Sequence, residues 1–361
     1  MSALNFYAGP RALEQLRAHG LRARDVAVIP AAAGGPKGLV FQSLDQWMFG
    51  EWLPSEARER TLIGSSIGAW RMAAACQRDP AASFKRLGDL YAGQRYTARP
   101  DQAEIDSVCR KMLAEFVTGH EEDILAHPHY RLHLLTNRGR GALASPSHRL
   151  HEIRGFAGAA LRNLASRERL APMLERVVLG DARDTAPWLR ERWDVFTTHF
   201  ASLTPRNLAA GLLASGTLPL IMPAVRALEE APEGAYWDGG IIDYHLALPY
   251  SRLAPGELVI YPHFTSEIVP GWLDKSLPWR RAHKGPNRHW LDNVIIAAPT
   301  PQFLRTLPRG KLPDRKDFKF YGLDQDERTR QWQKAISQGQ QLRDEFAAFV
   351  ANPDLSRVTP I

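Results

Sequence analysis

Two successive segments near the N-terminus follow one order: an apolar run, a glycine-rich turn and a helix-forming stretch. The first is "DVAVIPAAAGG" (25–35), after which apolar residues from Val40 to Met48 recur at helical spacing. The second is "RTLIGSSIGAW" (60–70), which an alanine-rich stretch follows. A continuous apolar run is typical of a parallel strand that is buried on both faces. Two such units predict an α/β fold with a mostly parallel sheet.

The rest of the chain supports one layered domain over 1–361, with a core of 25–263 and a C-terminal extension of 264–361. Further strands are expected at 131–137, 194–200 and 257–264, and helices at 10–19 and, as one long polar helix, 326–350. The segment 208–225 carries no charge. Glycines and prolines interrupt it, so it predicts a buried helix that runs into a proline-rich turn, and not a membrane span.

Composition limits the class of protein and its partners. A hydrophobic content of 44% and a charged content of 24% are those of an ordinary globular protein. The net charge of +7 favours anionic partners such as phospholipid headgroups or nucleic acid. No nucleic-acid-binding module is recognisable, so nucleic acid is not expected. Two cysteines and no secretory signal favour a cytoplasmic protein, with peripheral contact with anionic membrane as a further hypothesis.

The turn between 64 and 68 reads Gly64-Ser65-Ser66-Ile67-Gly68, with a strand expected before it and a helix after it. A sharp strand-to-helix turn holds its central residue in a strained conformation, and glycine is needed two positions to either side because larger side chains would collide. The positive end of the helix dipole favours a developing anion there. Ser66 is therefore a candidate nucleophile. The alternative is a polar residue in a loop.

The glycine-rich stretch "AAGGPKGL" (32–39) can present backbone N–H groups to an anion where a helix begins. It is not a nucleotide-binding loop, because Lys37 is followed by Gly38 instead of Ser or Thr. It could form an oxyanion hole for a carbonyl that Ser66 attacks. A purely structural turn is the alternative.

The third motif is "AYWDGGIIDYH" (235–245), in which Asp238 follows two aromatic residues and precedes two glycines. Asp-Gly is a common turn dipeptide, so a structural role is one interpretation. Apolar neighbours would desolvate the carboxylate, raise its pKa and make it a better base.

In this order the three motifs resemble the patatin-like phospholipase family. Its signature is a glycine-rich oxyanion loop, a G-x-S-x-G elbow and a later D-G-G or D-G-A. The resemblance extends over 25–263 and includes "ASGTLPLIMP" (214–223), which is similar to the family's alanine–serine segment ending in prolines. One departure is Ala33, which stands where the family usually has the first of three glycines. The resemblance implies a three-layer α/β/α sandwich with a mostly parallel central sheet.

The resemblance also implies a serine acyl hydrolase with Ser66 as nucleophile and Asp238 as base of a Ser–Asp dyad. Its substrates would be phospholipids or other lipid esters, cleaved through an acyl-enzyme without a metal or other cofactor. The residues expected on the oxyanion loop are Gly34, Gly35, Lys37 and Gly38. Three alternatives stay open: an α/β-hydrolase-like esterase with a Ser–His–Asp triad, an inactive lipid-binding protein, and an enzyme that transfers the acyl group to an acceptor other than water.

Histidines are the residues that separate a triad from a dyad. His245 and His263 both follow Asp238, so either would suit the chain order of a triad, although a packed structural histidine is favoured for each. His127, His129 and His133 lie close in sequence without a clear acidic or cysteine partner, so metal binding is not expected.

The run from Val269 to Trp290 mixes three tryptophans with basic residues. This composition suits a membrane-interface contact, and equally a loop anchored in the core whose charges are solvated. The residues concerned are Trp272, Trp279, Trp290, Arg280, Arg281, Lys284 and Arg288.

Overall fold

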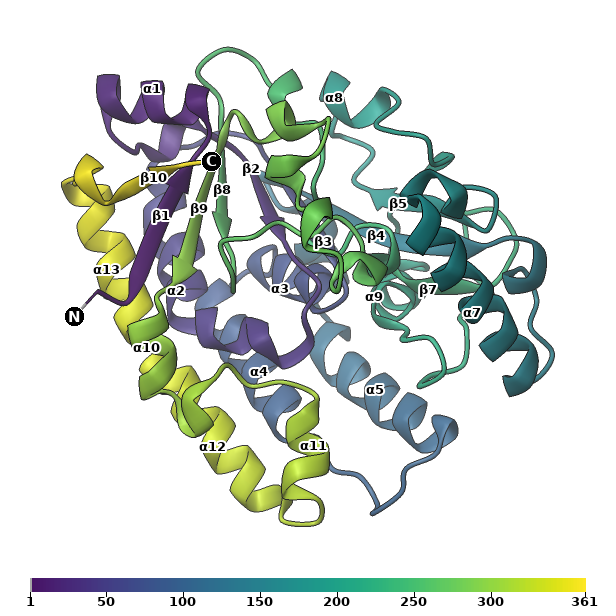
Figure 1. The fold of residues 1–361 in the computed structure, drawn as a ribbon. Helices are drawn as coiled ribbons and strands as arrows, with labels where there is room; N and C mark the ends of the chain where they lie inside the picture. The colour runs from purple at the N-terminus through teal and green to yellow at the C-terminus, as the bar shows by residue number, and fades with distance from the viewer. Residues whose placement is uncertain (1) are drawn as a thin grey trace.

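A large mixed sheet with helices on both faces forms the centre of the molecule, in a computed structural model that describes residues 2–361 (Figure 1). The order of the sheet is β10-β1-β9-β8-β2-β3-β4-β5-β6, and β7 pairs with β4 off this path. The strands are β1 (Leu4–Ala8), β2 (Val26–Ala31), β3 (Arg60–Ser65), β4 (Tyr130–Gly139), β5 (Leu174–Gly180), β6 (Thr198–Ser202), β7 (Tyr236–Asp238), β8 (Leu258–Pro262), β9 (Val294–Pro299) and β10 (Val358–Pro360).

Helices cover both faces of this sheet and give the α/β/α sandwich that the sequence predicts. The α-helices are α1 (Pro10–His19), α2 (Gln42–Trp47), α3 (Ile67–Ala75), α4 (Pro80–Ala92), α5 (Gln102–Val117), α6 (Glu121–Ala126), α7 (Arg149–Ala165), α8 (Pro187–Arg190), α9 (Leu208–Gly216), α10 (Pro301–Thr306), α11 (Lys316–Tyr321), α12 (Gln325–Gln338) and α13 (Gln340–Ala351).

The central strands β8, β2, β3 and β4 are all parallel to their neighbours in that order, so the prediction of a mostly parallel sheet is confirmed. Every residue of β2 and β3 is buried, as their continuous apolar runs predict. In the register of this pair, Ala31 lies opposite Gly64. The two glycine-rich turns that follow these strands therefore leave the same edge of the sheet side by side.

Two predicted elements differ from those observed. The strand expected at 194–200 begins only at Thr198, because the Asp194 carboxylate accepts a hydrogen bond from the Phe196 N–H and holds a turn there. The helix expected at 326–350 is two helices, α12 and α13, that meet at Gly339. A Cβ atom at Gly339 would lie 2.0 Å from the Val40 carbonyl oxygen, so the break lets the backbone pack closely on the chain before α2.

The C-terminal region contributes to the same sheet and core as the N-terminal region. Strands β9 and β10 flank β1 at one edge (Figure 1), and one hydrophobic cluster includes residues from Ala3 to Val358. This shared core supports the single-domain organisation, which stays a prediction. The uncharged segment 208–225 forms the buried helix α9 and then turns. Within residues 2–361, no helix has both the length and the hydropathy that crossing a membrane requires.

A buried ion-pair network ties β5 to the segment that follows β7. The Arg176 guanidinium donates to both carboxylate oxygens of Asp243 and to both of Asp194, and Arg176 and Asp243 are almost completely buried. The Asp243 N–H in turn bonds to the carbonyl of Gly239. The network thus supports the turn that carries Asp238.

We expect Arg176→Met to lower the free energy of unfolding by about 3–5 kcal/mol, because it leaves the buried Asp243 carboxylate without its partner. Arg110→Met, which removes an exposed pair with Asp106 one helical turn away, should change it by less than about 1 kcal/mol. Chemical denaturation of both variants measures the difference. Equal stabilities would contradict the role of the network.

Candidate active site

Ser66 occupies the strained turn between β3 and α3 that the sequence predicts. Its backbone angles are φ 56° and ψ −130°, a region that side-chain-bearing residues rarely adopt. A Cβ atom at Gly64 would lie 2.5 Å from the Ala69 nitrogen, and one at Gly68 would lie 1.9 Å from the Ala31 carbonyl oxygen. Both flanking glycines are therefore required by close backbone contacts, and the turn holds the Ser66 hydroxyl at the first turn of α3.

Asp238 ends β7, and side chains of β4 fix the backbone around it. Thr136 donates to the carbonyl of Trp237, and the Asn137 amide donates to the carbonyls of Asp238 and Gly239. The Asp238 Oδ1 accepts a hydrogen bond from the Gly240 N–H at 2.7 Å. The carboxylate is therefore held in one orientation, with Oδ2 left for another donor.

The side chains of Ser66 and Asp238 meet across the sheet edge. The Ser66 Oγ donates to the Asp238 Oδ2 over 2.7 Å, and each residue is only 4% exposed. Burial raises the pKa of the Asp238 carboxyl, while the Arg315 guanidinium and the hydrogen bond from Ser66 act in the opposite direction. A hydroxyl is thus hydrogen-bonded to a carboxylate, and burial makes this carboxylate more basic.

Ser215, on α9, supports this turn, and sequence reasoning gave it no role. The Ser215 hydroxyl oxygen accepts a hydrogen bond from the Ser66 N–H at 2.9 Å, and the Ser215 O–H donates one to the Leu135 carbonyl. The Asp238 N–H bonds to the carbonyl of Thr217. Ser215 belongs to the segment 214–223 that resembles the family, and this resemblance could have drawn attention to it. The segment alone does not show which backbone group Ser215 contacts.

The glycine-rich loop after β2 lies against both other motifs. A Cβ atom at Gly240 would lie 2.8 Å from the Ala33 side chain, and one at Gly38 would lie within 4 Å of Ile67. The Ala33 N–H bonds to the Tyr244 carbonyl, so it is occupied. Within residues 2–361, the N–H groups of Gly34 and Gly35 have no acceptor. Both N–H groups are therefore free to bind an anion.

Two cavities meet at the Ser66–Asp238 pair. Ser66 lines a cavity of about 430 Å³, and Asp238 lines a second of about 410 Å³; Leu218 and Arg315 line both. The first, which we call the apolar cavity, is bounded mainly by apolar side chains: Ile67, Trp70, Ile105, Met112, Leu213, Leu218, Met222 and Phe318. The second, which we call the cationic cavity, contains Lys37, Lys275, Arg315 and Lys316.

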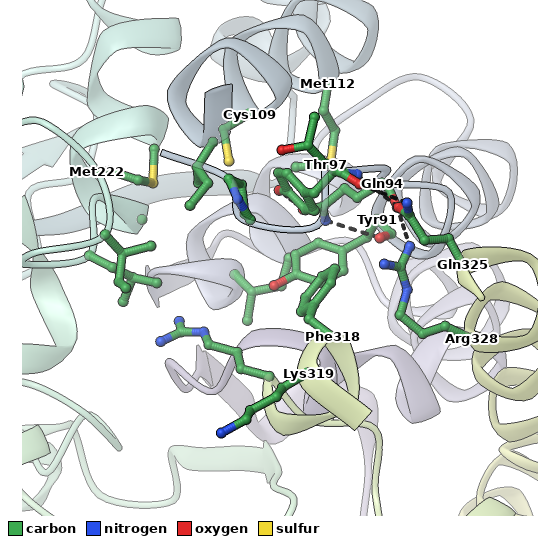
Figure 2. A pocket seen from close by; sticks show the side chains of 18 of the residues that line it. Tyr91, Gln94, Thr97, Cys109, Met112, Met222, Phe318, Lys319, Gln325 and Arg328 are labelled. Carbon is green, nitrogen blue, oxygen red and sulfur yellow. Dashed lines mark hydrogen bonds between the residues drawn. The ribbon is translucent and has the colours of Figure 1, made fainter. Parts of the chain in front are cut away.

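The close view in Figure 2 shows how elements distant in sequence enclose the apolar cavity. Cys109 and Met112 of α5 lie on one side with Met222, and Phe318 of α11 lies across from them with Tyr91 between. Gln94, Gln325 and Arg328 gather at one end, where the Arg328 guanidinium donates to the Gln94 carbonyl. The cavity is thus apolar along its length and polar at one end.

The two histidines that follow Asp238 in the sequence, His245 and His263, are bonded to other parts of the structure than Ser66 and Asp238. The His245 Nδ1 lies within hydrogen-bond distance of the Glu267 carbonyl and the Val269 N–H, and the His263 Nδ1 of the carbonyl and N–H of Thr265. Burial lowers the pKa of His263 to about 3 and that of His245 well below its ordinary value. Among the described residues, neither histidine has a hydrogen bond to Ser66 or Asp238.

The histidines at 127, 129 and 133 have separate surroundings. His133 pairs with Asp184 at 2.9 Å, and the His127 ring stacks on Tyr130. Across the part of the chain that the structure describes, no group of three or more His, Cys, Asp or Glu side chains is arranged to hold a metal ion.

The basic and aromatic run 269–290 is anchored to the body of the protein. Arg280 bonds to Asp274 and to backbone carbonyls at the end of α7, and the buried Arg281 bonds to Glu267 and to three carbonyls. Trp290 is buried, whereas Trp279 is exposed. The core-anchored loop therefore describes Arg280 and Arg281, whereas Lys284 and Arg288 are exposed.

Comparison with known proteins agrees with this geometry. The family model for patatin-like phospholipase matches residues 59–248, more than half of the chain, a range that includes both Ser66 and Asp238. No curated protein matches the sequence. The chain belongs to the patatin-like phospholipase family.

Proposed function

We propose that this patatin-like lipid acyl hydrolase cleaves phospholipids or other lipid esters through a Ser66–Asp238 dyad. Family membership supports lipid acyl hydrolysis in general. The single observation that carries the dyad is the 2.7 Å hydrogen bond from the Ser66 hydroxyl to the buried Asp238 carboxylate, at a strained turn where two cavities meet.

The proposed reaction proceeds through an acyl-enzyme. Asp238 removes the Ser66 proton as the Oγ attacks the ester carbonyl carbon, and the N–H groups of Gly34 and Gly35 stabilise the oxyanion. The C–O bond to the alcohol breaks, and Asp238 returns the proton to the departing oxygen. Water then attacks the acyl-enzyme, gives a proton to Asp238, and releases the fatty acid, after which Ser66 regains its proton.

The pH dependence follows from the pKa of Asp238. The carboxylate acts as base only when deprotonated, so activity should rise with pH through its pKa. Burial raises that pKa above the value of an ordinary aspartate, so the rising limb should lie at higher pH than for an exposed carboxylate. The same limb should stay in place when either buried histidine is replaced.

The apolar cavity supports a lipid acyl chain as the group that enters beside Ser66. A hydrolysis screen tests this assignment: esters of increasing acyl length, both phospholipid and soluble, are compared on the wild type and on Ser66→Ala. Activity that increases with chain length and disappears in the variant supports the proposal. Hydrolysis of acetyl esters alone, without longer chains, would contradict it.

For the membrane partner, we propose that α7 is the contact surface. The helix buries one side through Glu152, Gly155, Ala159 and Asn163. On the opposite side, residues spaced three and four apart form an exposed apolar stripe, which we call the α7 stripe: Leu150, Ile153, Ala157, Leu161 and Leu164. Exposed arginines flank the stripe at 149, 154 and 162. An apolar stripe between cations suits an anionic bilayer.

The start of α7 lies beside a smaller cavity that shares residues with the apolar cavity. Arg149 lines this smaller cavity of about 340 Å³ together with Pro100, Ile105 and Ile221, and these last three also line the apolar cavity. At the other end of the helix, Arg280 bonds to the carbonyls of Asn163 and Leu164, which brings the exposed Trp279 close to the stripe. A bilayer on α7 would therefore lie near the route of an acyl chain.

Replacing Leu161 and Leu164 together by serine should weaken binding to anionic vesicles about tenfold, because two exposed apolar side chains no longer enter the interface. Sedimentation with vesicles measures this, and binding should fall with salt. The matched control is Val195→Ser, an exposed apolar residue away from the stripe. Unchanged binding of the double variant would contradict the assignment. Turnover of a soluble ester should stay the same.

A further inference from the structure

The cationic cavity beside Asp238 collects positive side chains from three separated segments. Lys37 comes from the glycine-rich loop, Lys275 from the turn after 271–274, and Arg315 and Lys316 from the start of α11. All three segments lie outside the range that the family model matches, and two of them belong to the C-terminal part of the chain. This concentration of charge is therefore built largely by the C-terminal part of the chain.

The fold holds these cations without neutralising them. Within residues 2–361, none of Lys37, Lys275 and Arg315 forms an ion pair with a carboxylate. The Lys37 ammonium lies 4.6 Å from the centre of the Phe264 ring, and that of Lys275 lies 4.0 Å from the Tyr244 ring. Asp314, the acidic residue beside Arg315, is paired with Lys311 at 3.1 Å. Aromatic faces position the ammonium groups and leave their charge available.

The electrostatics of the cavity favour the binding of an anion. Burial, with Lys37 and Arg315 nearby, lowers the pKa of Lys275 to about 8. Burial also lowers the pKa of Lys37; Asp314, which lines the same cavity, acts in the opposite direction, and Arg315 adds to the lowering. A bound anion would offset this mutual repulsion and raise the pKa of both lysines.

We infer that Lys275 and Arg315, together with Lys37, bind an anionic group, phosphate or carboxylate, on the alcohol side of the scissile ester. The inference rests on the proposed function, in which the acyl chain occupies the apolar cavity. The ester then lies at Ser66, where Leu218 and Arg315 line both cavities. The alcohol part consequently points past Asp238 into the cationic cavity. The site thus favours esters whose leaving alcohol carries a negative charge.

The test compares two substrates with the same acyl chain, lysophosphatidic acid and monoacylglycerol, in the same neutral detergent micelles. We expect Lys275→Gln to lower the ratio of kcat/KM for the phosphate-bearing ester to kcat/KM for the uncharged ester roughly tenfold or more, since any change at Asp238 affects both esters alike. Lys334→Gln is the matched control, since this exposed lysine on α12 lines neither cavity. Equal effects on both substrates, or no effect on either, would overturn the inference.

A second variant and a pH series give independent readouts. Arg315→Gln should reduce the preference for the anionic ester too, and should also raise the pKa of Asp238, because Arg315 lowers it. In the wild type, the preference should decline as pH rises through the pKa of Lys275, since a lysine above its pKa loses its charge. A preference that does not change with pH between 6 and about 10 would contradict the role of Lys275.

Simple anions then distinguish the source of the negative group. Competitive inhibition of monoacylglycerol hydrolysis by inorganic phosphate, weakened in Lys275→Gln, supports a site that accepts phosphate itself. Inhibition by succinate under the same conditions supports a carboxylate. A preference for the anionic lipid without inhibition by either ion assigns the site to a lipid headgroup. If the wild type hydrolysed neither ester, the proposed function itself would be wrong. A loss of activity seen only in Lys275→Gln would leave the proposed function standing.

Discussion

Ser66→Ala is expected to abolish ester hydrolysis, by a factor on the order of 10³ or more, while the protein stays folded. The hydroxyl is the only part of the side chain that is removed, and it donates its hydrogen bond to Asp238. The strained backbone is set by Gly64, Gly68 and the hydrogen bond from the Ser66 N–H to Ser215, none of which the substitution alters. Hydrolysis of a soluble ester and a thermal melt are the two measurements.

The neighbouring serine supplies the matched control. Ser65 is buried on β3, and among the described residues its hydroxyl has no hydrogen-bond partner. Ser65→Ala should therefore keep most of the activity. A fluorophosphonate probe should label the wild type and Ser65→Ala, but not Ser66→Ala. Failure to label the wild type would favour an inactive lipid-binding protein, and hydrolysis retained by purified Ser66→Ala would refute the nucleophile.

The parts of the fold that local sequence determines could be predicted. Strands β2 and β3 are apolar runs that end in glycines, and both glycine-rich turns are where the pattern places them. The pairing of β1 between β9 and β10 could not be predicted in this way, because both partners lie far away from β1 in sequence. The break at Gly339 likewise depends on the approach of Val40, which no local pattern reveals.

The candidate site likewise contains residues that could be predicted from the sequence and residues that could not. Ser66, Asp238 and the glycine loop belong to motifs whose residue types and spacing reflect strict local geometry. Lys275 and Arg315 belong to no motif, since a cation is defined as part of a site only by the cavity that it faces. The sequence suggested Arg280 and Arg281 for contact with anionic lipid, yet both are consumed by bonds within the protein. The amino-acid composition shows how many charged residues there are, but not which of them form ion pairs within the protein.

Asp238→Asn should reduce hydrolysis nearly as much as Ser66→Ala, by a factor on the order of 10³, because the amide cannot accept the serine proton. The substitution keeps the size of the side chain and an acceptor oxygen for the Gly240 N–H, so the turn should persist. Steady-state rates on a soluble ester measure the loss. The wild-type rising limb of the pH–rate profile should be absent from any residual activity.

Replacing the histidines tests whether Asp238 itself acts as the base or only orients a histidine that does. In a triad the histidine is as important as the nucleophile, whereas a dyad needs none. His245→Asn and His263→Asn retain a polar amide near the Nδ1 position, where it can bond to the same backbone groups of 265–269, so each should fold and keep most of its turnover. Because both histidines are buried with lowered pKa values, they are neutral near pH 7, and removing either leaves the charge around Asp238 unchanged. If either folded variant were as inactive as Ser66→Ala, the dyad would be wrong and a triad would take its place.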